Sequence, residues 1–145
     1  MNIEQISPYL IAIFAAWLIA HAIKFVISLI NKEKRSLRTH LFISGGMPSA
    51  HTASVIAMTT VIGLRDHIYS GLFGLAVLFS CITIYDAMKV RRSSGEQGEA
   101  IHKLIKEQKS KITPPRVYMG HSPREVIFGI LLGLVIGIVV FLSTK

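Results

Sequence analysis

Apolar residues occur in four long runs along the chain, and polar segments separate the runs. The first run covers residues 8–30, which is long enough for a helix to cross a hydrocarbon core about 30 Å thick. The other three cover residues 48–64, 68–90 and 122–142. This pattern predicts an all-α membrane protein with about four transmembrane helices. Because no linker or soluble segment interrupts it, residues 1–145 are predicted to form a single integral-membrane domain.

The polar segments differ in length, and their lengths predict how the runs are connected. Residues 65–67 form a short turn that makes an antiparallel hairpin of the second and third runs. Residues 31–46 and 91–121 form two long loops, and with four spans both lie on the same side of the membrane. Within the longer loop, Gly95 to Ser110 has an amphipathic pattern, which predicts an interfacial helix along the membrane surface.

The distribution of basic residues predicts the orientation in the membrane. Residues 31–47 and 89–121 together hold twelve Lys and Arg, whereas the other side has Arg65 and Lys145. Lys and Arg concentrate in cytoplasmic loops. The two long loops are therefore predicted to face the cytoplasm of a multi-pass cell-membrane protein, with both termini on the opposite side.

The composition excludes an ordinary soluble domain. Of the 145 residues, 51% are hydrophobic and only 17% are charged, whereas soluble domains carry about 25% charged residues. The net charge of +8 suits anionic lipid headgroups or a phosphorylated substrate, and no nucleic-acid motif accompanies it. The single cysteine, Cys81, lies inside an apolar run. This excludes an intramolecular disulfide and a multi-cysteine metal cage.

The segment before the second run has a pattern typical of an anion site. Ser44 to His51 places Gly45, Gly46 and Pro48 where a loop becomes a helix, followed by Ser49 and His51 in the opening turn. The N–H groups of a first helical turn are free, and the helix dipole attracts negative charge. A phosphate would fit on these amides with His51 nearby. The alternative interpretation, equally weighted, is that Ser44 or Ser49 caps the helix and His51 is an interfacial residue.

A second candidate lies at the start of the fourth run, where His121 precedes Glu125 by four residues. In a helix both side chains project from one face. A carboxylate that holds one ring nitrogen of a histidine leaves the other as a nucleophile or base. Ser122 and Glu125 also have the spacing of a capping box, and the tetrad alone slightly favours that structural interpretation.

Several ionisable residues lie inside or at the ends of the apolar runs, where charges are costly and often functional. Lys24 follows His21 by one helical turn, and Asp86 closely precedes Arg91 and Arg92. Structural explanations exist for each: Lys24 can snorkel, and Asp86 can pair with Lys24 or Lys89. The four-span topology nevertheless places all the candidates on the same membrane side, which favours a shared site. They are Lys24, His51, Arg91, Arg92, His121 and Glu125.

Three glycines recur every four residues along the fourth run, at Gly129, Gly133 and Gly137. This spacing of small residues lets two membrane helices approach closely. It predicts a helix interface.

These motifs resemble those of a known family. Pro48-Ser49-Ala50-His51 resembles the Pro-Ser-Gly-His motif of the type 2 phosphatidic acid phosphatase (PAP2) and vanadium haloperoxidase superfamily, and His121-x-x-x-Glu125 resembles its His-x-x-x-Asp motif. The length and layout of the chain are similar to those of the divergent PAP2 branch called the DUF212 or YuiD-like family. The superfamily's six spans exceed the four expected here, which suggests a PAP2-like helical bundle that a homodimer completes.

The resemblance implies a metal-independent phosphoric ester hydrolase that acts on a lipid phosphomonoester or diphosphate and needs no cofactor. Phosphatidylglycerophosphate, phosphatidic acid and isoprenoid-lipid phosphates are the expected substrates. His121 is the expected nucleophile, Glu125 orients it, and His51 is the general acid. The expected phosphate-binding residues are Lys24, Gly46, Ser49, Arg91, Arg92 and Arg116. The alternative is a non-catalytic or transport protein in which Lys24, Asp86, His51 and His121 form a buried polar network.

Overall fold

The computed structural model describes residues 6–31, 46–115, 117 and 120–145, and all regular secondary structure among them is helical. The predicted all-α class is confirmed. The elements in chain order are α1 (Pro8–Ile30), α3 (Ala50–Arg65), α4 (Gly71–Tyr85), the π-helical turn η2 (Asp86–Val90), α5 (Arg91–Glu107) and α6 (Pro123–Ser143).

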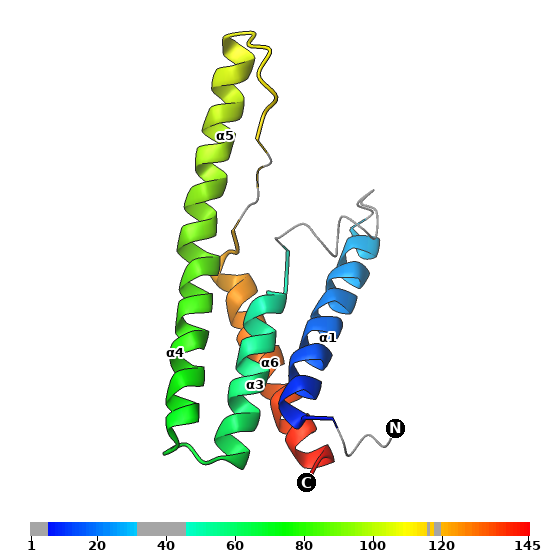
Figure 1. Cartoon of the computed structure of the whole chain (residues 1–145). Helices are drawn as coiled ribbons and strands as arrows, with labels where there is room; N and C mark the ends of the chain where they lie inside the picture. Colours follow the sequence, from blue (N-terminus) through cyan, green and yellow to red (C-terminus); the bar gives the residue numbers. More distant parts are fainter. Residues whose placement is uncertain (1–5, 32–45, 116, 118–119) are drawn as a thin grey trace.

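Helix α3 lies at the centre of the bundle, with α1 and α4 on either side and α6 packed against it (Figure 1). Among its sixteen residues only His51 and Leu64 are exposed. Its hydroxyl side chains bond to the neighbouring helices: Ser54 donates to the carbonyl of Ile13 at 3.3 Å, and Thr59 shares a hydrogen bond of 2.9 Å with Ser80. The central helix is therefore surrounded by protein along most of its length.

Glycines let α6 approach α3 closely, as the sequence predicts. A Cβ atom added at Gly129 would lie 2.8 Å from the carbonyl oxygen of Ser49, and one added at Gly133 would lie 2.6 Å from that of Ala53. At Gly137 the nearest atom, Cβ of Thr60, would lie at 2.6 Å. Any side chain at these three positions would push the helices apart, so the seam fixes the register of α6 against α3.

Within the described residues, three helical segments are long and apolar enough to cross a membrane: Pro8–Ile30, Gly71–Glu107 and Pro123–Ser143. Their outward faces carry large exposed hydrophobic side chains, which suits contact with lipid. The central helix α3, with sixteen residues, spans about 24 Å and is shorter than the others. The described part of the chain is thus that of a membrane protein, with three candidate spans by length and composition and a shorter helix, α3, enclosed among them.

One long helix replaces the predicted break after the third run. Residues Gly71–Glu107 form 37 continuous helical residues, about 55 Å long, because η2 joins α4 to α5 without an interruption. The helix predicted over Gly95 to Ser110 is present as α5, but its course differs from the prediction. It continues in the direction of α4 (Figure 1) instead of turning along the membrane surface, since no proline or glycine cap ends α4.

Polar contacts hold the end of the bundle where α1 begins and α6 ends (Figure 1). The hydroxyl of Tyr9 donates to Asp66 at 2.6 Å, which ties α1 to the turn after α3. Arg65 donates to the backbone and side chain of Thr144 after α6. The first turns of α1 and the last turns of α6 are therefore fastened to the same turn, and the candidate site residues gather at the opposite end.

Candidate functional site

His121 and Glu125 form a close pair at the start of α6. The Nδ1 atom of His121 lies 2.6 Å from Oε2 of Glu125, and the His121 side chain is only 3% exposed. Ser122 is the N-cap of α6, and its hydroxyl accepts from the backbone N–H of Glu125 at 3.4 Å. The serine half of the predicted capping box is therefore present, whereas the Glu125 carboxylate, which that box would have occupied locally, contacts the histidine.

The pairing defines the state of the His121 ring. A carboxylate oxygen can only accept, so Nδ1 carries the proton and the lone pair is on Nε2. Burial lowers the pKa of His121 below its ordinary value of 6.5, and the hydrogen bond to Glu125 opposes this shift without reversing it. At neutral pH the ring is therefore uncharged with an available Nε2, the form that a nucleophilic histidine requires.

Two backbone contacts fix the position of His121. Its N–H donates to the carbonyl oxygen of Ala87 in η2 at 2.9 Å. A Cβ added at the preceding Gly120 would lie 2.5 Å from the backbone nitrogen of Arg92. The Gly120–His121 segment thus rests directly on the backbone of the long helix, at a place where a larger residue than glycine would not fit.

Ser49 joins the start of α3 to the start of α6. Its backbone N–H donates to the carbonyl of Glu125 at 3.0 Å, and its hydroxyl caps α3 and accepts from the Thr52 hydroxyl at 3.0 Å. Ser49 is fully buried and both of its polar groups are bonded within the protein. The helix accordingly begins at Ala50, two residues after the predicted start at Pro48. The role that this geometry gives Ser49 is to hold the first turn of α3 beside His121.

His51 is exposed in that first turn, and basic groups from several elements surround it. Lys24 and His21 of α1, Arg91 of α5 and His121 all lie close enough to act on it electrostatically. Lys24 is also within electrostatic reach of His121 and Glu125. The structure therefore brings together most of the predicted site residues in one basic cluster around a single histidine–carboxylate pair.

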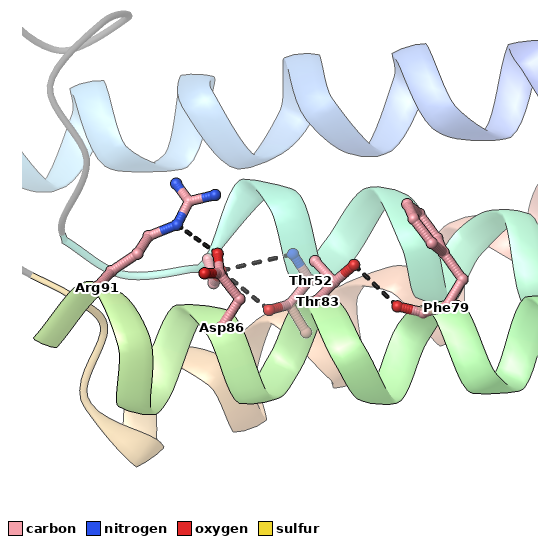
Figure 2. Close-up of polar contacts among 6 residues, drawn as sticks. Thr52, Phe79, Thr83, Asp86 and Arg91 are labelled. Carbon is pink, nitrogen blue, oxygen red and sulfur yellow. Dashed lines mark hydrogen bonds and ion pairs between the residues drawn. The ribbon is translucent and has the colours of Figure 1, made fainter.

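Among the predicted arginines, Arg91 lies in the cluster and Arg92 does not. Nε of Arg91 lies 2.6 Å from Oδ2 of Asp86, and Figure 2 shows the Arg91 side chain turned back toward that carboxylate. Asp86 is therefore bonded to Arg91 and not to the predicted partners Lys24 or Lys89. Arg92 instead forms an exposed pair with Glu96 at 3.1 Å on the outer side of α5.

Some of the predicted residues have no described side-chain role. Gly46 is exposed in the loop before α3, and its φ of +81° is a conformation that favours glycine. Arg116, Ser44 and Gly45 lie outside the described residues.

His21 lies in the cluster but is not among the predicted site residues. Its position one helical turn before Lys24 is the sequence signal that could have identified it. Within the described part of the chain, no group of three His, Cys, Asp or Glu side chains is placed to hold a metal ion.

The fold and the site define a class of protein: a small helical membrane protein with a buried histidine–carboxylate pair at the edge of a basic cluster. Residues 6–136 match the sequence model of the divergent PAP2 family, DUF212, and the chain belongs to that family. It is 36% identical to the uncharacterized membrane protein YuiD of Bacillus subtilis (strain 168), over 90% of this chain and 89% of that protein. No solved structure matches it significantly.

Proposed function

We propose that this protein is a membrane phosphatase that hydrolyses a lipid phosphomonoester or diphosphate through a phospho-histidine intermediate. The observation that carries the proposal is the contact of 2.6 Å between Nδ1 of the buried His121 and Oε2 of Glu125, because a proton held on Nδ1 by the carboxylate leaves Nε2 as the nucleophile. Membership of the divergent PAP2 family supports a phosphatase-related role. The basic cluster supplies the charge that a phosphate dianion requires.

In the first step, Nε2 of His121 attacks phosphorus while the bond from phosphorus to the lipid oxygen breaks. His51 donates its proton to that leaving oxygen, and the Glu125 carboxylate stabilises the positive charge that develops on the His121 ring. In the second step, His51 takes a proton from water, the water oxygen attacks phosphorus, and the bond from phosphorus to Nε2 breaks. Inorganic phosphate leaves and the enzyme returns to its initial state.

The surrounding residues stabilise the phosphoryl oxygens, which is the main task in phosphoryl transfer. Lys24 and Arg91 supply positive charge from two different helices. The first turn of α3, which Ser49 caps, supplies the positive end of a helix dipole beside the cluster. Gly46 and Arg116 are further phosphate contacts predicted from the sequence, whereas the pair with Glu96 makes Arg92 the weaker candidate. A bound phosphate would in turn favour the protonated form of His51 that the first step needs.

The arrangement favours this function over a proton or ion path. The polar candidates gather at one end of the bundle, whereas the core between α1, α3 and α6 toward the other end is built from apolar residues such as Ala16, Ala57 and Ile136. A proton or ion path would need ionisable groups along the length of the bundle, whereas the polar side chains described midway along α3 are hydroxyls bonded within the protein, such as Thr59 with Ser80. The charged residues are thus better placed to meet a headgroup at the membrane surface.

The test is phosphate release by the purified protein in detergent, from phosphatidylglycerophosphate, phosphatidic acid and isoprenoid diphosphates, with a chelator present. We expect turnover by the native protein, none by His121→Ala, and a loss of about 10²–10⁴-fold in His51→Ala. His102→Ala is the matched control, because this histidine of α5 contacts Pro115, away from the cluster. Orthovanadate should inhibit competitively. Silence of the folded native protein across the whole panel would contradict the proposal.

A further inference from the structure

An apolar groove lies between α1 and α6, next to the basic cluster. It is a cavity of about 400 Å³ lined by Ile23 and Ile27 of α1, Met47 and Pro48 before α3, and four residues of α6 between Phe128 and Val135. Every lining residue is apolar. The volume is in the range of about 300–1,000 Å³ found for small-molecule sites.

The groove exists because α1 and α6 pack closely at one end of the bundle only. Ala12 and Ala16 of α1 share a buried cluster with Ile136 and Val140 of α6, toward the end where Tyr9 fastens α1. Toward the site end the two helices diverge (Figure 1). The groove lies in this space, and its α6 wall includes Leu131, which is half exposed on one of the apolar candidate spans.

Each wall of the groove begins beside a residue of the site. Ile23 precedes Lys24, Pro48 precedes Ser49, and Phe128 follows Glu125 by about one helical turn. A molecule that occupies both places therefore needs an anionic head and an apolar tail. The α6 wall, from Phe128 to Val135, is about 10 Å long, which suits the upper part of a single hydrocarbon chain.

We propose that this groove binds the head-proximal part of one hydrocarbon chain of a lipid whose phosphate lies among Lys24, His51, Arg91 and His121. The inference rests on the proposed function for the identity of the headgroup. It adds the direction of access: the substrate enters sideways from the leaflet between α1 and α6, and water-soluble phosphates lack the contacts made by the chain. Specificity for lipids over soluble phosphates follows from the groove, and the chemistry follows from the cluster.

Binding can be measured without turnover by tryptophan fluorescence. Trp17, the single tryptophan, is replaced by Phe, and a new tryptophan is introduced in the groove by Leu131→Trp or, as the matched control, on the exposed α6 surface outside it by Val139→Trp. Each variant is reconstituted in vesicles containing either phosphatidic acid or phosphatidylcholine with dibrominated acyl chains, at equal mole fractions. Bromine quenches only a tryptophan that it contacts.

We expect dibrominated phosphatidic acid to quench the Leu131→Trp protein more than dibrominated phosphatidylcholine does, and the two lipids to quench the control equally. Adding Lys24→Gln should remove the excess, because the headgroup then loses a cation. Equal quenching of the groove tryptophan by both lipids would show a surface that bulk lipid covers, and absence of quenching would show a groove covered by protein. Either result overturns the proposal.

Activity assays separate this inference from the proposed function. Ile27→Phe, which narrows the groove, should lower the ratio of kcat/KM for a long-chain lipid phosphate to that for a soluble short-chain phosphate by about tenfold or more, since even one methylene of misfit in an apolar pocket changes kcat/KM by about 10–200-fold. Val139→Phe should leave this ratio unchanged. Selective quenching without any phosphate release would contradict the proposed phosphatase activity but support lipid binding in the groove. Phosphate release without selective quenching would contradict only the proposed lipid binding in the groove.

Discussion

The backbone N–H of His121 donates a hydrogen bond of 2.9 Å to the carbonyl oxygen of Ala87. In a regular α-helix the Ala87 carbonyl would accept from Arg91, four residues later. In the π-helical turn the backbone N–H of Arg91 instead donates to the backbone carbonyl oxygen of Asp86. The Ala87 carbonyl oxygen is therefore available to the His121 N–H. The irregular turn of the long helix thereby anchors the proposed nucleophile, consistent with the frequent occurrence of π-bulges at functional sites.

This contact predicts that Gly120→Ala inactivates the protein. The new Cβ would lie 2.5 Å from the nitrogen and 2.8 Å from the Cα of Arg92, and backbone atoms cannot give way as a flexible side chain can. The Gly120–His121 segment must therefore shift and His121 with it, and a misplacement of about 1 Å costs on the order of 10²-fold in rate. Phosphate release measures the effect.

The matched control is Gly74→Ala in α4, where nothing lies within 4 Å of an added Cβ. It should keep full activity and raise stability slightly, by up to about 1 kcal/mol, because alanine is the better helix former. Equal activity of the Gly120 and Gly74 variants would disprove the positioning argument.

Replacing Glu125 by Gln tests whether its carboxylate has a role beyond the helix terminus. The Ser122 hydroxyl still caps α6, so the thermal unfolding midpoint should change little. Activity should fall by roughly 10⁴-fold, the loss seen when the carboxylate of a hydrolytic triad becomes an amide. Glu96→Gln, which removes only the exposed pair with Arg92, is the control. Full activity of the Glu125→Gln protein would leave Glu125 a purely structural residue.

Arg91 and Arg92 are adjacent, and the structure predicts opposite results for them. Arg91→Gln removes a cation that acts on both His51 and His121. It should weaken competitive inhibition by orthovanadate by about 1.5–3 kcal/mol, or roughly 10- to 150-fold in the inhibition constant. Arg92→Gln breaks an exposed pair of small energetic value and should bind vanadate as the native protein does. The reverse order would show that the phosphate contacts the outer side of α5.

The pH dependence follows from the buried state of His121. Because burial lowers the pKa of this ring below 6.5, the acid limb of kcat/KM should lie below pH 6.5, where protonation removes the Nε2 lone pair. The free energy of unfolding should also fall as the pH drops below 6.5. As the pH falls, His121 of the unfolded chain binds a proton at a higher pH than His121 of the folded chain, so protonation favours the unfolded state. His121→Gln should remove this part of the pH dependence of the unfolding midpoint. An acid limb above pH 6.5 would contradict the assignment.

The orientation can be tested with single cysteines in a Cys81→Ser background. Gln108→Cys lies at the exposed end of α5, and Ser143→Cys lies at the end of α6 near the C-terminus. If the site faces the cytoplasm, a membrane-impermeant thiol reagent should label the Ser143→Cys protein in intact cells and the Gln108→Cys protein only after lysis. The opposite pattern would place the site outside and direct the search for substrates to externally exposed lipid phosphates.

The sequence by itself determined the features that depend on local pattern. The first helix has the predicted bounds, residues 8–30, and α6 begins and ends within one residue of the prediction, because a long apolar run bounded by a proline and polar residues permits few other structures. The glycine seam followed from its spacing. The four-residue separation of His121 and Glu125 indicated both a contact between them and a serine cap, and the structure has both.

The tertiary structure decided the features that depend on competition between partners. Asp86 had several basic residues within reach in the sequence, and the π-helical turn selected Arg91. Ser49 was a candidate phosphate ligand, but the close packing of α6 on α3 gave both its polar groups partners inside the protein. The course of α5 and the groove between α1 and α6 likewise depend on where whole helices meet. Periodicity shows which face of a helix is apolar, but only packing decides which neighbour covers that face and where it stays open.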